Sequence, residues 1–423
     1  MVLPLVLACQ LTDVGIAGIK AGEIIMAVLT PFILSGAIKK KSGAMELFCL
    51  FSLFLLLALI KNQFTIFYSP QSASFLRQPY LISVSRYIQI LICVLAVLHV
   101  WQVANGGDRA RRLAAWFLRF NAVFGIVFII AAVLSYIGID NDLTYGNDNR
   151  LRGFFIEGGP LGLFYAALFC FSYFIKKRIT PTDAVFAIVV VLSYSKAGAI
   201  LIAIMLAYAS ITTSQKIGSA LKTVFILALA MAGAYFAYGD RLAAYVSDTV
   251  SIESAMKGRE NDTSLVMGRI AGVHIGAQMI KENPLFGVGL GNYSLVRNDP
   301  VYRANLPYVD DWDLTGLGLF TLAVECGLVG LAAFLVVVIS LIRRIEGAAG
   351  RLIAITAILC FMLGVQIYFI YPWVIFAIGS VLSYATARDA ARQLSTQNIS
   401  AFGFDRSDRQ CVTISEPSPR RGK

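Results

Sequence analysis

The sequence is poor in charged residues. Only 14% of its 423 residues are Asp, Glu, Lys or Arg, whereas 58% are hydrophobic. Soluble domains carry about 25% charged residues. A chain with so few charges cannot bury all its apolar side chains in one water-surrounded core. The composition therefore excludes an ordinary soluble domain.

Cysteine and histidine form no recognisable metal-binding pattern. The seven cysteines include no Cys-x-x-Cys pair, and the histidines are His99 and His274 alone. Zinc sites need clusters of these residues at short spacing. We therefore expect no metal site and no cofactor, and we interpret the cysteines as small buried hydrophobic residues.

Long apolar runs, in contrast, recur along the whole chain. Inside a bilayer every backbone N–H and C=O group must be paired within the segment, so such runs predict helices. They lack the apolar–polar alternation of β-barrel strands. We expect an all-α, polytopic inner-membrane bundle of about 12 transmembrane helices, using about 20 residues per crossing. These spans lie near residues 2–18, 22–38, 45–60, 80–102, 112–137, 159–175, 181–194, 196–212, 219–237, 315–342, 350–368 and 371–388.

The basic residues predict how this bundle lies in the membrane. They cluster at residues 39–41, 109–112, 176–178, 216–222 and 343–351, which all fall on one side of the predicted bundle. Cytoplasmic loops are rich in Lys and Arg, so we expect this side and both termini to be cytoplasmic. The net charge of +11 then needs no nucleic-acid partner. We expect a transmembrane domain over 1–389, with a large periplasmic loop at 239–314, and a disordered cytoplasmic tail over 390–423.

Two arginines stand at the predicted outer edge of the membrane. Arg152 leads into a span, and Arg269 lies in a stretch at 267–282 that we expect to form a helix along the outer membrane surface. One face of this helix is apolar: Ile270, Val273, Ala277 and Ile280. The planar fork of arginine fits phosphate oxygens, so both residues suit a site that releases pyrophosphate without a metal. Snorkelling or a loop salt bridge is the alternative for each, and Arg150 is expected to be a solvated loop charge.

A glycine-rich segment follows the amphipathic stretch. Residues 287–291 read Gly-Val-Gly-Leu-Gly, and no strand–helix–strand pattern surrounds them. A dinucleotide-binding loop would need that pattern. We therefore expect a tight turn whose backbone N–H groups can face an anion.

Taken together, these elements resemble the O-antigen polymerase and O-antigen ligase family of bacterial envelope glycosyltransferases. The resemblance covers residues 150–340. It rests on an arginine, a helix and a glycine turn in that order: Arg269, Pro284, Gly287, Gly289, Gly291, Asn292 and Tyr293. Further similar elements are Arg152-Gly153-Phe154, Ser195-Lys196-Ala197-Gly198 and the segment from Glu325 to Gly330.

The resemblance implies a GT-C-like fold and a metal-independent polymerase. Such an enzyme joins oligosaccharide repeat units carried on undecaprenyl pyrophosphate into O-antigen or exopolysaccharide at the periplasmic face. Arg152 and Arg269 would hold the pyrophosphate, and Glu157 or one of Asp310, Asp311 and Asp313 would act as the base. The expected substrate-binding residues are Arg86, Lys196, His274, Gly289, Asn292, Tyr293 and Glu325. Expected partners are membrane lipids, a chain-length regulator and a flippase.

One departure from the family pattern bears on the reaction. Family ligases, and many polymerases, carry a His-Asn pair about nine residues before the glutamate that resembles Glu325, where this sequence has Gly316 and Leu317. Polymerases of the family vary more at this position. The missing pair favours a polymerase over a ligase that transfers glycan to lipid A-core. His274 could take the place of that histidine, or it could lie on a solvated helix face. A polysaccharide or lipid-linked oligosaccharide transporter is the alternative of another class, although transporters usually show repeats and midplane charges.

Overall fold

The structure is a computed structural model that describes most of the helical part of the chain. The described residues are 2–16, 19–37, 44–68, 78–104, 107–145, 149–213, 268–303, 305–308 and 316–382. The span predicted at 219–237, the tail over 390–423 and the candidate bases Asp310, Asp311 and Asp313 lie outside them.

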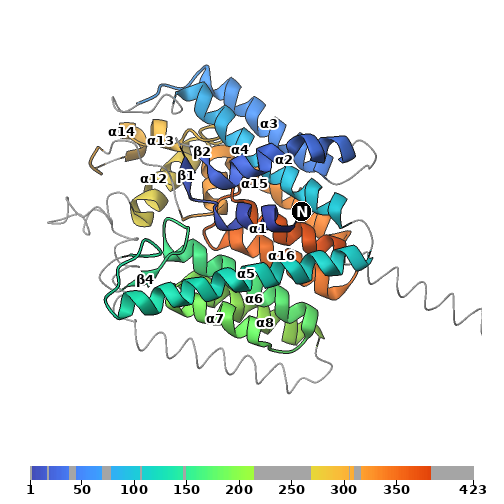
Figure 1. Ribbon diagram of the computed structural model, residues 1–423. Coiled ribbons are helices and arrows are strands. Elements are labelled where there is room, and N and C mark those ends of the chain that lie inside the picture. Colours follow the sequence, from blue (N-terminus) through green and yellow to red (C-terminus); the bar gives the residue numbers. More distant parts are fainter. Residues whose placement is uncertain are drawn as a thin grey trace, which may run out of the picture.

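Long helices packed side by side make up most of the molecule (Figure 1). The helices are α1 (Val2–Gln10), α2 (Ala21–Ala37), α3 (Ala44–Asn62), α4 (Pro79–Val103), α5 (Gly107–Tyr136), α6 (Gly158–Lys176), α7 (Pro181–Leu192), α8 (Lys196–Thr213), α12 (Arg269–Glu282), α13 (Tyr293–Val296), α14 (Pro300–Arg303), α15 (Leu319–Arg343) and α16 (Ala348–Met362). Residues Ile370–Leu382 form a further apolar helix. Two antiparallel hairpins, β1 (Gly15–Ile16) with β2 (Ile19–Lys20) and β3 (Thr144–Tyr145) with β4 (Arg150–Leu151), depart from the all-α prediction.

Five of the described helices are long and apolar enough to cross a membrane. They are Met45–Asn62, Pro79–Val103, Gly107–Tyr136, Gly158–Lys176 and Leu319–Arg343. Each coincides with a predicted span, which confirms a polytopic helical membrane protein. Five shorter apolar helices accompany them in the described residues: Ala21–Ile33, Pro181–Leu192, Lys196–Ser210, Ala348–Met362 and Ile370–Leu382. The predicted total of twelve spans fails at residues 2–18 and stays a prediction for the rest of the chain.

The first predicted span, 2–18, is wrong. Helix α1 has only nine residues, and at about 1.5 Å per residue it is far shorter than the roughly 30 Å hydrocarbon core. The Thr12 hydroxyl donates to the carbonyl oxygens of Ala8 and Cys9, 3.2 and 2.8 Å away. These bonds satisfy carbonyl groups that the end of the helix leaves open. The chain then turns into the β1–β2 hairpin, because Gly15 and Thr12 favour turns over helix.

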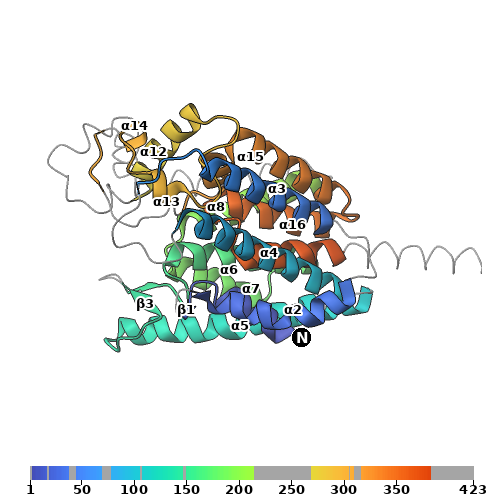
Figure 2. The same cartoon turned by 90° about the horizontal axis from the view of Figure 1, so that it is seen from above.

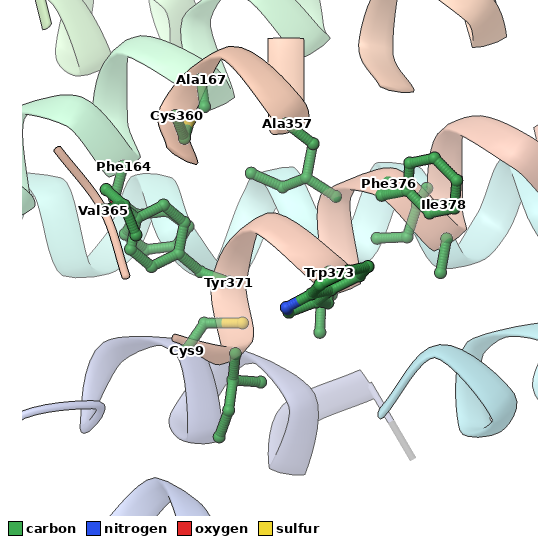
Figure 3. Packing of buried hydrophobic residues seen from close by; sticks show 14 of the residues in the cluster. Cys9, Phe164, Ala167, Ala357, Cys360, Val365, Tyr371, Trp373, Phe376 and Ile378 are labelled. Atoms are coloured by element: carbon green, nitrogen blue, oxygen red, sulfur yellow. The ribbon is translucent and has the colours of Figure 1, made fainter. Parts of the chain in front are cut away.

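Helix Ile370–Leu382 lies in the interior of the core. Figure 3 shows its Tyr371 and Trp373 among side chains from neighbouring helices. The Tyr371 ring lies 4.7 Å from the Phe164 ring of α6, and the Trp373 ring lies 5.2 Å from Phe361 of α16. The indole Nε1 of Trp373 donates to the carbonyl of Ile367 at 2.6 Å. This enclosure is what a helix that is apolar on all sides is expected to adopt.

The two ends of the bundle differ in character. At one end Arg344, after α15, forms an ion pair with Glu46 at the start of α3. At the other end Lys61 of α3 donates to Asn283, which follows α12, at 2.6 Å. Figures 1 and 2 both show α12, α14 and the β3–β4 hairpin at the same end of the molecule. The two arginine-bearing loops therefore share one end, opposite the Arg344 end.

Candidate functional site

Arg269 is the first residue of α12, and its side chain lies against the start of α15. Gly316 has a positive φ of +70°, and a methyl group there would lie 2.5 Å from the Arg269 Nε atom. The guanidinium group thus packs directly on the backbone of residue 316. Arg269 is otherwise exposed, so a ligand can reach it.

The rest of α12 packs on α15 through small residues. A methyl group at Gly276 would lie 2.6 Å from the Phe320 ring, so only glycine allows this approach. The buried residues of α12 are Ile270, Ala271, Gly272, Ile275, Gly276 and Met279. The predicted helix is confirmed, but its predicted apolar face is wrong for Ala277, which is exposed. Hydrophobicity misplaced the face because the contact surface includes two glycines, which carry no apolar side chain.

Helix α15 is broken at Gly327, and the glycine turn, residues 284–291, fills the break. Gly327 has φ 71° and ψ −179° inside the helix. The break exposes the carbonyl groups of Val324 and Glu325. These accept hydrogen bonds from the backbone N–H groups of Val288 and Gly289, at 3.0 and 2.8 Å.

The donors beyond the break are satisfied by the same turn. The N–H groups of Leu328 and Val329 donate to the carbonyl oxygens of Pro284 and Leu285, at 2.9 and 3.3 Å. A broken helix is tolerated at membrane depth only where other groups pair its backbone. The glycine turn does this for α15, and a side chain on Gly327 would collide with Leu285.

Asn292 ties the glycine turn to α3 and α4. It is 0% exposed, and its Nδ2 donates to Asn62 Oδ1 at 2.5 Å and to the Val288 carbonyl at 3.0 Å. The Ser83 hydroxyl of α4 donates to the Leu290 carbonyl at 2.8 Å. Asn292 therefore has a structural task, and substrate contact by this residue stays a prediction. The adjacent Tyr293 is likewise buried.

Glu325 lies beside this turn, and the residue is buried. It meets the turn and α3 at a packed junction that leaves no space for a water molecule, formed by Phe54, Leu57, Ala58, Phe286, Gly289, Leu290, Glu325 and Cys326. Gly289 and Glu325 thus lie together, and their contact with substrate stays a prediction.

The Arg152 loop, residues 149–157, lies between α5 and α6. The Nε atom of Arg152 donates to the Asp142 carbonyl at 3.0 Å, and its guanidinium lies 5.9 Å from the Tyr145 ring. Arg150 donates to the Ser193 carbonyl at 2.8 Å. The prediction that Arg150 is only a solvated charge is therefore wrong, because this bond ties the loop to the α7–α8 turn. Glu157 is exposed just before α6.

The Ser195 element brings α6 and α8 together. The Ser195 hydroxyl donates to the Gly159 carbonyl at 2.9 Å and accepts from the Gly198 N–H at 3.1 Å. A methyl group at Gly198 would lie 2.7 Å from the Gly162 carbonyl oxygen. Such small-residue contacts let membrane helices approach closely. Lys196, the first residue of α8, is exposed at this crossing.

Arg86 of α4 reaches the other side of the glycine turn. Its Nη1 donates to Gln89 Oε1 at 2.9 Å, and its guanidinium lies 4.4 Å from the Tyr368 ring. A methyl group at Gly291 would lie 2.9 Å from Arg86 Cγ. Arg86 therefore lies beside the turn, and its predicted contact with substrate stays a prediction. His274 is half-buried on α12.

Sequence reasoning missed a buried arginine close to the turn. Arg297 follows α13 and is buried, and this burial lowers the pKa of its guanidinium group. Burial likewise raises the pKa of Tyr302, whose hydroxyl accepts from Asn283 at 3.0 Å. The sequence feature that could have indicated Arg297 is its position shortly after the glycine-rich motif.

Comparison with known proteins identifies a family over the central part of the chain. Residues 182–335 match the family model described as O-antigen ligase. The matched region runs from α7 to α15 and includes Arg269, the glycine turn and the break at Gly327. No curated protein matches the sequence. The match confirms the predicted resemblance to the O-antigen ligase and polymerase family and, with the apolar helices, supports a multi-pass membrane protein.

Proposed function

From this family relationship we propose that the protein polymerises lipid-linked oligosaccharide repeat units at the periplasmic face of the bacterial inner membrane. A hydroxyl oxygen of one undecaprenyl-pyrophosphate-linked unit bonds to the anomeric carbon of the chain on a second carrier. The bond from that carbon to the pyrophosphate oxygen breaks, with inversion, and its electron pair leaves with the pyrophosphate. The hydroxyl proton passes to a base. The product is an O-antigen or exopolysaccharide chain.

The contact between Arg269 and Gly316 is the observation on which we base the proposed reaction. Family ligases have a histidine about nine residues before the glutamate, and Gly316 occupies that position here. The positive φ of Gly316 disfavours any side chain, and the Arg269 guanidinium fills the adjacent space. The Arg269 guanidinium thus lies beside the position of the missing histidine, which supports binding of a phosphate oxygen there. Because ligases also release a lipid pyrophosphate, the preference for a polymerase rests on the missing His-Asn pair.

Arg152 and Arg269 are proposed to hold the pyrophosphate together. Both loops lie at the same end of the molecule (Figures 1 and 2). To serve one diphosphate, the two guanidinium groups must come within about 10–15 Å of each other, given the reach of arginine and its short charge-assisted bonds. They would stabilise the negative charge that develops on the leaving group, with no metal required. Glu157 is exposed and stays a candidate base. Asp310, Asp311 and Asp313 are the other candidates.

The remaining elements of the proposal follow from the family resemblance. The bundle would be GT-C-like, with its C-terminus in the cytoplasm. The predicted cytoplasmic N-terminus required the span at 2–18, and helix α1 is too short to provide it. Exposed Lys196 and half-buried His274 would contact the glycan or lipid phosphates, as would Arg86. A flippase would supply the lipid-linked units, and a chain-length regulator would act on the product.

Polymer analysis in a deletion strain tests the proposal. Arg152→Ala and Arg269→Ala should each abolish polymer while the protein still inserts, and Arg→Lys should also be poor because a point charge loses the bidentate fork. Arg112→Ala is the matched control, because Arg112 is an exposed arginine at the start of α5. Full-length polymer from both alanine variants at normal expression would remove the two arginines from the mechanism.

The same experiment separates the alternatives. If the protein is a polymerase, its inactive variants leave single repeat units on the acceptor lipid. If it is a ligase, they leave polymer on the undecaprenyl carrier without surface attachment. If it is a transporter, they leave lipid-linked units on the cytoplasmic side.

A further inference from the structure

A row of polar side chains connects α2 to α4, outside the region that matches the family. Gln89 Nε2 donates to Glu23 Oε1 at 2.9 Å, and Arg86 Nη1 donates to Gln89 Oε1 at 2.9 Å. Next to Glu23, Lys20 forms an ion pair with Asp13 at 3.2 Å. Two carboxylates and two cations thus gather in an otherwise apolar part of the chain.

This arrangement is costly for a membrane protein. Glu23 is 7% exposed, and the Asp13 side chain is 3% exposed. Buried charges are expensive even when they are paired, and apolar residues of similar size often serve stability equally well. Fold stability alone therefore gives little reason to keep these charges.

The polar row touches both loops of the candidate site. At one side, Arg86 packs against Gly291 of the glycine turn. At the other side, the N–H group of Ile156, in the Arg152 loop, donates to Asp13 Oδ2 at 3.5 Å. Lys20 lies 5.5 Å from the centre of the Tyr368 ring on which Arg86 also stacks. The row therefore lies between the two loops that carry the family motifs.

The chemistry of the row fixes the direction of each bond. An ionised carboxylate can only accept hydrogen bonds, so Glu23 makes Gln89 present its NH₂ group on that side. The amide oxygen of Gln89 must then face Arg86, where it accepts from the guanidinium. Without Glu23 the amide could rotate and present its NH₂ group to the cation, which would repel it. Glu23 thus determines which way Arg86 is held.

We propose that Glu23 is a positioning residue for the transfer reaction: through Gln89 it holds Arg86 against the glycine turn, where Arg86 binds a phosphate oxygen of the lipid-linked substrate. This inference rests on the proposed function, because it needs a pyrophosphate at the turn. Lys20 lies near Glu23 and forms an ion pair with Asp13. Asp13 in turn accepts the hydrogen bond from Ile156 in the Arg152 loop.

Turnover of lipid-linked repeat units by the purified full-length protein tests the inference. Glu23→Ala should lower kcat/KM by about 10- to 100-fold, by analogy with the loss of an orienting partner behind a metal ligand. Arg86→Ala should cost as much or more. The double variant should be no slower than Arg86→Ala, because residues that act as a unit are not additive. Glu23→Gln retains an acceptor oxygen for Gln89 and should be several-fold more active than Glu23→Ala. This difference corresponds to the net contribution of about one hydrogen bond.

Controls separate this inference from the proposed function and from misfolding. Glu46→Ala, which removes an exposed carboxylate at the other end of the bundle, should leave turnover unchanged. If Glu23→Ala does not accumulate, Gln89→Leu interrupts the same row and should show the same loss. Normal turnover in Glu23→Ala or Gln89→Leu, or fully additive losses in the double variant, would overturn the positioning role. Failure of the unaltered protein to join lipid-linked repeat units would instead refute the proposed function itself.

Discussion

The bond between Asn292 and Asn62 gives the sharpest test of how the glycine turn is held. Asn292→Ala removes two hydrogen bonds donated by Nδ2, and leaves the acceptors on Asn62 and Val288 buried without this donor. A buried hydrogen bond contributes about 1 kcal/mol net, and a buried unsatisfied group costs about 1–3 kcal/mol. Because the change also leaves a small cavity, we expect a loss of about 2–4 kcal/mol in the free energy of unfolding.

The assay is denaturing-detergent titration of the purified protein in micelles, followed by helical content. Gln63→Ala is the matched control, because Gln63 is an exposed amide next to Asn62. A double-mutant cycle with Asn62→Ala and Asn292→Ala isolates the pair and should give a coupling energy of about 1 kcal/mol. A coupling energy of zero, with each single variant as stable as the Gln63→Ala control, would show that this bond does not hold the turn.

Three further perturbations have definite expected outcomes. Gly316→Ala should displace Arg269 and reduce polymer without loss of insertion, since its methyl group would lie 2.5 Å from the guanidinium; normal polymer length would contradict this. Gly162→Ala should place a methyl group against Ser195 and lower unfolding free energy by about 1–3 kcal/mol, the usual cost of overpacking; unchanged stability in the same titration would speak against the close crossing. Reporter fusions at residues 147 and 261 should report the periplasm and fusions at Lys177 and Arg344 the cytoplasm; a cytoplasmic signal at residue 261 would refute the proposed mechanism.

Hydropathy predicted the long helices well, because a continuous apolar run has few alternatives in a bilayer. It failed at residues 2–18, where the run is apolar enough but Thr12 and Gly15 end the helix. It also could not show that α15 is broken, since Gly327 lies within an apolar sequence. The break depends on bonds to a segment about 40 residues earlier in the chain, and no local pattern records such pairing.

For the candidate site, the order of motifs identified the right segments but not the task of each residue. Asn292 belongs to the resemblance, yet it is enclosed and bonded to Asn62. Glu23 was overlooked because a single acid at the start of an apolar helix looks like a helix-capping charge. Its importance appears only when α4 brings Gln89 alongside it. Contacts between distant segments decide these roles, and sequence spacing carries no information about them.

The pairing between the glycine turn and the two halves of α15 has a consequence for biogenesis. The turn leaves the ribosome before α15 does, because residues 284–291 precede residues 319–343. Four of its backbone groups then lack the partners that they have in the finished protein. They must stay hydrated until the later helix enters the lipid, since an unpaired polar group in hydrocarbon is costly. A nascent chain that stops before Leu328 therefore has an unformed site, so catalytic competence is acquired late in synthesis, at the insertion of α15.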